Sequence, residues 1–166
     1  ASGGDDNVLI GRDAGDALTT GDQNVAVGFE ALSTEDAHGQ NVAIGYRALK
    51  ALDAGADGFN TAVGAAAGES VTTGVNNTLI GGLAGDSITV GHRNIAVGKD
   101  TLKTNVGGAK NVAIGDGALS TLNSGSTASD MQNTAVGHFA GGAMTTGTNN
   151  TIIGALAGDA LTTGGN

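Results

Sequence analysis

The sequence predicts an all-β protein, a parallel β-solenoid of nine coils with about 17 residues in each coil. The pattern Asn, two residues, Val or Ile, then Gly occurs nine times. Six of the eight intervals between these Asn are 17 residues, and the other two are 19 and 22. A fixed period of this size indicates a repeat architecture, in which each unit buries its apolar side only against its neighbours. Because aromatic residues make up only 2%, we expect a thin core of small and aliphatic side chains.

Composition excludes several other classes of protein. Gly is 31 of 166 residues, yet Pro is absent and hydrophobic residues reach 39%, which fits neither a disordered chain nor a collagen. The net charge of −9 disfavours binding to nucleic acid or to anionic membranes. The absence of Cys excludes a disulfide framework and a thiolate metal site. No apolar run approaches the roughly 18 residues of a membrane span. We expect one domain, residues 1–166, cut from a longer array, since the next Asn of the series would follow directly after Asn166.

The Asn of the pattern, taken as position one of each repeat, is predicted to have a structural role. Stacked coils place these Asn about 4.8 Å apart. At that spacing side-chain amides pass hydrogen bonds from one coil to the next, as Asn ladders do in cross-β structures. The nine residues are Asn7, Asn24, Asn41, Asn60, Asn77, Asn94, Asn111, Asn133 and Asn150.

Positions two to five are predicted to form a short strand followed by a corner. Position four is always β-branched, which favours a strand, and position five is always Gly, which permits the positive φ of a chain reversal. Positions two and four share one face of the strand, and we predict that position four lies in the core. The predicted core residues are Ile10, Val27, Ile44, Val63, Ile80, Val97, Ile114, Val136 and Ile153. The corner residues are Gly11, Gly28, Gly45, Gly64, Gly81, Gly98, Gly115, Gly137 and Gly154.

Position three, on the opposite face of the strand, is also apolar in every repeat. A solenoid that stands alone should show polar residues on its outer face. We therefore predict that position three faces outward and contacts other copies of the chain. The predicted oligomer interface consists of its largest members, Leu9, Leu79 and Ile152.

Two kinds of repeat alternate along the chain. In glycine coils, Gly occupies position nine; these coils begin at Asn7, Asn60, Asn77, Asn133 and Asn150. In leucine coils, Leu occupies position nine; these begin at Asn24, Asn41, Asn94 and Asn111. The segments Tyr46–Leu52 and Asp116–Leu122 of the leucine coils fit either a strand or one helical turn, and the pattern leaves both open.

Both insertions fall in the second leucine coil of a pair, near residues 54–59 and 124–132. Insertions in a solenoid map to loops on one side, which is often the binding side. The candidate ligand-contacting residues are Asp57, Phe59, Ser126, Asp130 and Met131.

The repeats resemble the head repeats of trimeric autotransporter adhesins of the YadA type, whose motif reads Asn-Ser-Val-Ala-Ile-Gly. The segments 41–45 and 111–115, both Asn-Val-Ala-Ile-Gly, match its core. Repeats of phage tail fibres and large bacterial surface proteins are similar too. They run Asn-Thr-Ala-Val-Gly-Tyr-x-Ala-Leu, matched by residues 60–64 and 46–49. The resemblance covers nearly the whole chain from Asn7, although the repeat here is longer than that of the adhesins.

The resemblance implies a left-handed parallel β-roll, assembled as a homotrimer and displayed on a bacterial surface or on a virion. It implies the function of an adhesin head or fibre segment that attaches to a host receptor, glycan or matrix protein. The stalk, membrane anchor and phage chaperone that often follow such repeats are missing from the sequence. A purely structural spacer of a fibre is the main alternative.

An ice-binding solenoid is a further alternative, because Thr recurs in the repeat. Position two carries Thr61, Thr78, Thr134 and Thr151, and Thr also recurs at positions thirteen and fourteen of the glycine coils. The leucine coils interrupt the second array, where Asp36, Asp53, Val106 and Asn123 stand at position thirteen. Because β-branched Thr favours strands in any case, the pattern also has a plain structural explanation.

The sequence offers no set of residues that indicates catalysis. His38, His92 and His138 occupy different positions of the repeat, so we expect no shared metal site. Glu69 and Asp86 share position ten on adjacent coils, where a Ca²⁺ ion is the only cofactor we consider. Solvated turn carboxylates explain the same pair. No nucleophile with a base and an orienting group is present, so we do not expect an enzyme.

Overall fold

The computed structural model describes residues 4–165, and over that range the chain forms a parallel β-solenoid without helices. Nine three-residue strands make one sheet in the order β1-β2-β3-β4-β5-β6-β8-β10-β11. They are β1 (Val8–Ile10), β2 (Val25–Val27), β3 (Val42–Ile44), β4 (Thr61–Val63), β5 (Thr78–Ile80), β6 (Ile95–Val97), β8 (Val112–Ile114), β10 (Thr134–Val136) and β11 (Thr151–Ile153). A second, two-stranded sheet pairs β7 (Gly108–Ala109) with β9 (Ser129–Asp130).

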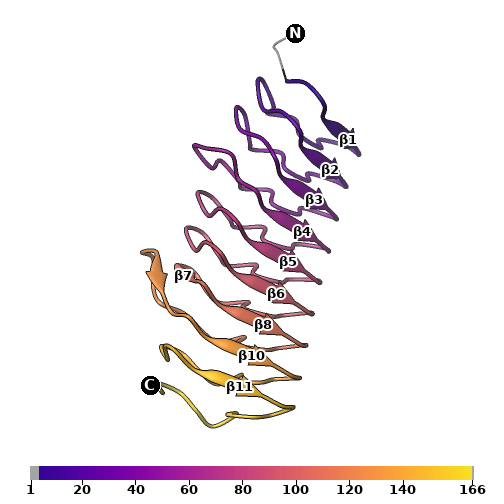
Figure 1. Ribbon diagram of the computed structural model, residues 1–166. Helices are drawn as coiled ribbons and strands as arrows, with labels where there is room; N and C mark the ends of the chain where they lie inside the picture. The colour runs from indigo at the N-terminus through magenta and orange to yellow at the C-terminus, as the bar shows by residue number, and fades with distance from the viewer. Residues whose placement is uncertain (1–3, 166) are drawn as a thin grey trace.

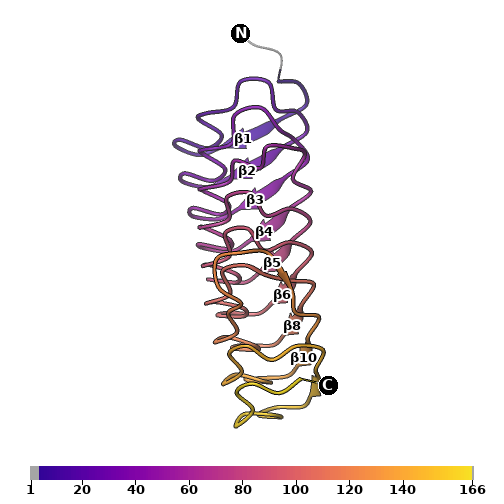
Figure 2. The same ribbon diagram turned by 90° about the vertical axis from the view of Figure 1, so that its left-hand side faces the viewer.

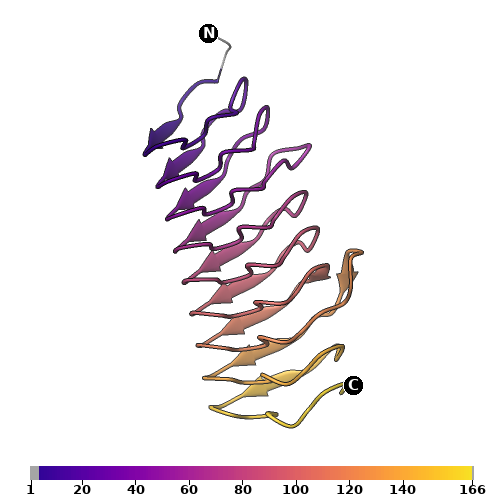
Figure 3. The same cartoon turned by 180° about the vertical axis from the view of Figure 1, so that it is seen from behind.

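The coils stack into a rod with the two ends of the chain at opposite ends (Figure 1). Every strand of the nine-stranded sheet pairs in parallel with the same repeat positions of its neighbour, as Leu9 does with Ala26 and Ala26 with Ala43. The two insertions leave this register unchanged, since Ala43 pairs with Ala62 and Ala113 with Ala135. The nine-stranded sheet lies along one side of the rod, and turns, together with β7 and β9, lie along the other (Figures 1 and 3). Figure 2 shows the rod from the side of these turns. The predicted solenoid of nine coils is confirmed.

The segments after the strands are turns, which answers the question left open for the leucine coils. Arg47 and Leu49 have left-handed backbones, with φ of 55° and 49°, and these values are incompatible with a helical turn. The amide of Lys50 donates to the carbonyl of Arg47 within the coil, at 3.3 Å. The amide of Leu49 donates instead to the carbonyl of Ala67 in the next coil, at 3.1 Å. Backbone amides of this segment thus donate either to a carbonyl of their own turn or to a carbonyl of the neighbouring coil.

The Gly at position five stacks as a column of backbone contacts along one edge of the sheet. Between Gly11 and Gly154 these residues have φ of 124–138°, a range that L side chains rarely adopt. In every coil but the last, a Cβ at this position would lie 2.8 Å or less from the carbonyl oxygen of the Gly in the next coil. Only Gly therefore allows the coils to approach this closely.

The Asn at position one form a continuous ladder through the rod. From Asn24 to Asn150, each backbone amide donates to the side-chain oxygen of the preceding Asn at 2.8–3.2 Å. From Asn41 onward, each side-chain amide also donates to that same oxygen, at 3.0–3.3 Å. Asn24 through Asn133 are buried, so the ladder satisfies polar groups that have no access to water.

The prediction that position four lies in the core is wrong. The Ile at this position are 38–70% exposed and the Val are only half-buried, whereas Ala at position three is fully buried from Ala26 to Ala135. The interior beside the strand is already occupied by long side chains from positions nine and twelve, so the strand contributes a small residue there. The residues on the outer face are thus Ile10, Val27, Ile44, Val63, Ile80, Val97, Ile114, Val136 and Ile153.

The predicted interface of Leu9, Leu79 and Ile152 is also wrong, because position three points inward. Leu79 is fully buried and Ile152 is 7% exposed. Leu9 is 43% exposed, because it lies in the first coil and only one coil covers it. Leu79 and Ile152 therefore have almost no surface with which to contact another copy, and Leu9 is exposed only because of its place in the end coil.

The large residues at position three fill space that the glycine coils leave empty. A Cβ on Gly68 would lie 2.7 Å from Leu79 Cδ1, and one on Gly85 would lie 2.8 Å from Leu79 Cδ2. Leu79 therefore occupies the volume that Leu at position nine occupies in a leucine coil, and it does so for two neighbouring glycine coils. Ile152 has the same relation to Gly141, at 3.0 Å.

No helix among the described residues is long and apolar enough to cross a membrane.

Candidate functional site

The most extensive surface feature is the outer face of the nine-stranded sheet, which we call the sheet face and define as positions two and four of each coil. Ile10, Ile44, Ile80, Ile114 and Ile153 are exposed at position four, and Val8 and Ile95 at position two. No strand of this sheet carries a charged residue, although the chain has 7 basic and 16 acidic residues. The sheet face is therefore an uncharged, β-branched strip along the whole rod.

The two insertion loops place four of the five candidate ligand-contacting residues at the surface. Asp57 accepts hydrogen bonds from the amide of Gly39 (3.1 Å) and the side chain of Gln40 (3.2 Å). Phe59 is 52% exposed, and Ser126 is exposed. Asp130 pairs with Lys110 at 2.5 Å, and this hydrogen bond lowers the pKa of the Asp130 carboxyl. Met131 is only 2% exposed and packs in the core, so its prediction as a ligand contact is wrong.

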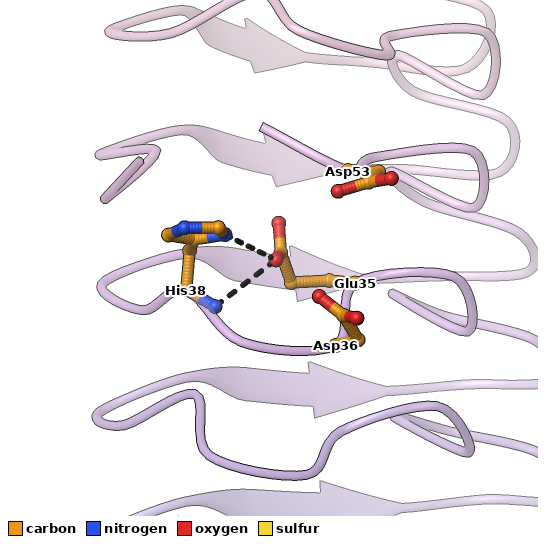
Figure 4. Close-up of side chains that lie close together, drawn as sticks. All are labelled: Glu35, Asp36, His38 and Asp53. Carbon is orange, nitrogen blue, oxygen red and sulfur yellow. Dashed lines mark hydrogen bonds and ion pairs between the residues drawn. The ribbon is translucent and has the colours of Figure 1, made fainter. Parts of the chain in front are cut away.

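A group of four titratable residues gathers on the leucine coils that begin at Asn24 and Asn41 (Figure 4). Glu35, Asp36, His38 and Asp53 each bring one ligand atom to within 4.8 Å of the others. Glu35 Oε1 accepts a hydrogen bond from the amide of His38 (3.1 Å) and lies 3.3 Å from His38 Nδ1. Glu35 Oε2 accepts one from the amide of Ala54, at 3.3 Å. The group links two successive coils at the first insertion.

Glu35 is the unusual member, because its side chain is completely buried. It stands at position twelve, where most coils bury Leu, Val, Ile or Met. Asn105, the other polar residue at this position, is buried as well and closes its turn by accepting from the amide of Gly108. Glu35 closes the equivalent turn through His38. A carboxylate at a position that is otherwise mostly apolar was the signal by which the sequence could have revealed this group.

The donor set of this group suits a divalent cation, since carboxylate oxygen and imidazole nitrogen are ordinary metal ligands. First-row metals bind such atoms at about 2.0–2.2 Å, which brings neighbouring ligand atoms to about 3.5 Å of each other. The four atoms, up to 4.8 Å apart, would have to move closer. The carboxylate oxygens of Glu35 already accept hydrogen bonds from two backbone amides, those of His38 and Ala54. His92 and His138 are not members of the group.

Glu69 and Asp86, the pair considered for Ca²⁺, lie near enough to influence each other. Burial raises the pKa of Asp86 and the negative charge of Glu69 raises it further. Glu69 also lies 3.5 Å from Arg47. Neither carboxylate belongs to a group of three or more potential ligands among residues 4–165.

An aromatic stack follows the first corners of the rod and was not anticipated from the sequence. The rings of Phe29 and Tyr46 lie 5.5 Å apart, and the guanidinium of Arg12 sits 4.3 Å from the Phe29 centroid. Arg47 and Lys50 both pair with Glu30, at 2.8 and 2.6 Å. The hydrogen bond from Lys50 is the main cause of the lowered pKa of the Glu30 carboxyl. The stacked rings of Phe29 and Tyr46 connect two neighbouring coils, and Tyr46 is still 49% exposed.

Comparisons with protein-family models, curated proteins and solved structures find no match for this chain. The resemblance to YadA-like and phage-fibre repeats therefore depends on the sequence pattern alone. The surface of residues 4–165 has no pocket. The exposed sheet face, the insertion loops and the group at Glu35 are therefore the candidate functional surfaces.

Proposed function

We propose that this chain is a non-catalytic segment of an extracellular fibre or adhesin head, assembled as a homotrimer and displayed on a bacterial surface or a virion. The observation that carries the proposal is the unbroken stacking of nine coils in one register. The left-handed β-roll and the trimer come from the resemblance, and the apolar sheet face supports association between copies.

A rod of this kind serves to hold a binding surface at a distance. Nine coils at about 4.8 Å each give a length of roughly 40 Å. The buried Asn ladder and the Gly column repeat at every boundary, including the two with insertions. Because every boundary between coils has the same ladder and the same Gly contacts, no boundary forms a hinge. The rod therefore holds its two ends at a fixed distance from each other.

Attachment is assigned to the exposed residues of the insertion loops, Asp57, Phe59, Ser126 and Asp130. Three copies present each loop three times, and this multiplies weak contacts into a stable attachment. The partner is a host receptor, glycan or matrix protein. In the alternative, a pure spacer, the same loops contact nothing.

The first test is the mass in solution by light scattering during size-exclusion chromatography. The proposal expects about three times the 15.9 kDa of one chain. A monomer at micromolar concentration would contradict the proposed assembly.

A second measurement separates the adhesin from the spacer. A variant with both insertions shortened to 17-residue coils is compared with the parent chain on a glycan array and on intact bacterial and animal cells. Binding by the parent that the variant loses supports attachment through the loops. Equal signals from both chains favour the spacer.

One observation favours ice binding as a second candidate function. Thr61, Thr78, Thr134 and Thr151 stand in register on the sheet face, beside half-buried Val and exposed Ile. A flat, regular, uncharged array of hydroxyl and methyl groups is suited to ordering water. Thermal hysteresis of a solution near freezing tests this candidate, and its absence would eliminate it.

A further inference from the structure

The two pairs of leucine coils differ at four equivalent positions. The first pair begins at residues 24 and 41, and the second pair at residues 94 and 111. In the first pair these positions hold the group drawn in Figure 4, namely Glu35, Asp36, His38 and Asp53. In the second pair the equivalent residues are Asn105, Val106, Gly108 and Asn123. Four potential metal ligands thus stand in one pair where the other pair has no titratable residue.

Closure of the turn does not require the two residues of this group that are unique among the nine coils. Glu35 is the only carboxylate at position twelve, and His38 is the only residue other than Gly at position fifteen. In the second pair, Asn105 Oδ1 accepts a hydrogen bond from the amide of Gly108 at 2.9 Å. Glu35 Oε1 accepts the equivalent bond from the amide of His38 at 3.1 Å. Because a neutral amide closes the same turn with a shorter bond, the carboxylate and the imidazole need another explanation.

The carboxylate of Glu35 is buried without a permanent positive charge beside it. Its side chain has no exposed surface, and among residues 4–165 only His38 lies within ion-pair distance of it. Its hydrogen-bond contacts measure 3.1–3.3 Å, whereas charge-assisted hydrogen bonds are typically about 2.7–2.9 Å long. Glu30, which is partly exposed, has Arg47 at 2.8 Å and Lys50 at 2.6 Å. Since buried charges are normally paired or bound to a metal, Glu35 lacks a cation.

The other three members of the group surround this carboxylate. His38 lies on one side of it, and Asp36 and Asp53 lie on the other (Figure 4). One ligand atom of each residue is within 4.8 Å of those of the others. Asp36 and Asp53 are exposed and His38 is half-buried, so these side chains can turn toward a shared ion. Three carboxylates at this spacing repel one another, and a divalent cation among them removes that repulsion.

We propose that Glu35, Asp36, His38 and Asp53 bind one divalent cation of the first transition row, such as Zn²⁺. Glu35 is the fixed ligand, and the three more exposed side chains close on the ion from the surface. One imidazole nitrogen with carboxylate oxygens suits Zn²⁺ or Mn²⁺, whereas Ca²⁺ takes oxygen ligands. Because Asp53 directly precedes the first insertion, the ion joins the base of that loop to the preceding coil.

Isothermal titration calorimetry with Zn²⁺ tests the site on the whole chain, prepared without a histidine tag and dialysed against a chelator. We expect one ion per chain, a dissociation constant in the micromolar range or lower, and a melting temperature that Zn²⁺ raises. The absence of saturable Zn²⁺ binding would overturn the proposal. Ca²⁺ should bind about tenfold more weakly or not at all. Equal affinities for the two ions would show that His38 is not a ligand.

The second pair of leucine coils supplies a variant that should still fold. Glu35→Asn with His38→Gly introduces the residues that the chain already carries as Asn105 and Gly108, which close the equivalent turn. Circular dichroism identical to that of the parent chain verifies the fold. We expect this variant to lose saturable Zn²⁺ binding. Binding with the affinity of the parent chain would place the ion elsewhere and overturn the proposal.

The matched control removes the two imidazoles outside the group. His92→Asn with His138→Asn should bind Zn²⁺ as the parent chain does, because neither residue belongs to the group. Loss of binding in this control would show that Zn²⁺ attaches to those histidines, contrary to the proposal.

Asp53→Asn tests the link between the two coils at an exposed side chain. Loss of a partner that merely orients a ligand costs about tenfold in metal affinity, so loss of the Asp53 ligand should cost no less. The melting temperature without Zn²⁺ should stay the same. Unchanged affinity for Zn²⁺ would overturn the proposed link at the base of the insertion.

Discussion

Glycine coils and leucine coils have nearly the same backbone but fill their interiors in different ways. Position nine is left-handed in both, with φ of 60–62° at Gly and 46–51° at Leu. In leucine coils that residue itself fills the interior, and Leu32, Leu49, Leu102 and Leu119 are completely buried. In glycine coils a large residue at position three of the same coil or the next one does so, as Leu79 does beside Gly68 and Gly85.

The comparison shows that the stacking of coils determines the backbone conformation at position nine, whichever residue, Gly or Leu, stands there. A left-handed Leu costs roughly 1–2 kcal/mol relative to Gly. Burial of the Leu side chain offsets this cost with about 1.5–3 kcal/mol. The four leucine coils therefore accept a strained residue because the interior would otherwise be empty.

The largest expected effect comes from removing the residue that serves two glycine coils. Leu79→Ala should lower the free energy of unfolding by about 2–5 kcal/mol, because it leaves a cavity beside Gly68 and Gly85. The matched control is Leu9→Ala, at the same position of the first coil but 43% exposed, with an expected loss of about 1 kcal/mol. Urea denaturation measures both. Equal losses of unfolding free energy in the two variants would show that Leu79 does not fill more of the interior than the exposed Leu9 does.

A smaller loss of stability is expected from adding a methyl group at Gly68, next to the volume that Leu79 occupies. Gly68→Ala should cost about 2 kcal/mol, because its φ is 60° and its Cβ would lie 2.7 Å from Leu79 Cδ1. In a Leu79→Ala background this contact is gone, whereas the backbone cost and the milder contacts with Leu49 Cδ2 (3.1 Å) and Val71 Cγ2 (3.2 Å) persist. The double variant should therefore lose less than the sum of the single variants, by about 1 kcal/mol. Additive losses in urea denaturation would argue against a shared volume.

The smallest effect concerns position ten, where several glycine coils carry a carboxylate. Asp86 has a raised pKa, from burial and then from Glu69, so ionising it opposes folding once the pH exceeds its ordinary value of 3.8. Asp86→Asn should stabilise the protein by a few tenths of a kcal/mol at pH 7, since solvent screens the pair. The gain should vanish below pH 3.8. Melting temperatures at pH 7 and pH 3.5 check this. Asp159→Asn, at an exposed position ten, should change neither.

The sequence was sufficient for the fold class because the period is a property of the whole chain. Nine Asn-and-Gly motifs, six of whose eight intervals are 17 residues, indicate one kind of stacking, and the ladder and the corners follow from it. The side of the strand that faces inward could not be predicted in the same way. β-branched residues suggested a core at position four, yet the interior volume is filled by side chains such as Leu49 and Leu52, which come from the turns that follow the strand.

The group at Glu35 was missed for a related reason. Asp36 and Asp53 share position thirteen, but His38 enters the group through a turn whose shape the pattern does not specify. Glu35 alone was visible in the sequence, as a charged residue at a position that is otherwise mostly aliphatic. Comparing each coil with its equivalents, position by position, would have identified it.

The pairing of glycine coils with a large position-three residue also restricts how such a rod can lengthen during evolution. Leu9, Leu79 and Ile152 recur at every fourth coil, in step with the order of glycine and leucine coils. Duplicating one coil would leave an interior either empty or overfilled, and it would also break the regular alternation of Ile and Val at position four. Duplicating four coils preserves both patterns. Gene duplication can therefore extend the rod without repacking only in steps of about 19 Å.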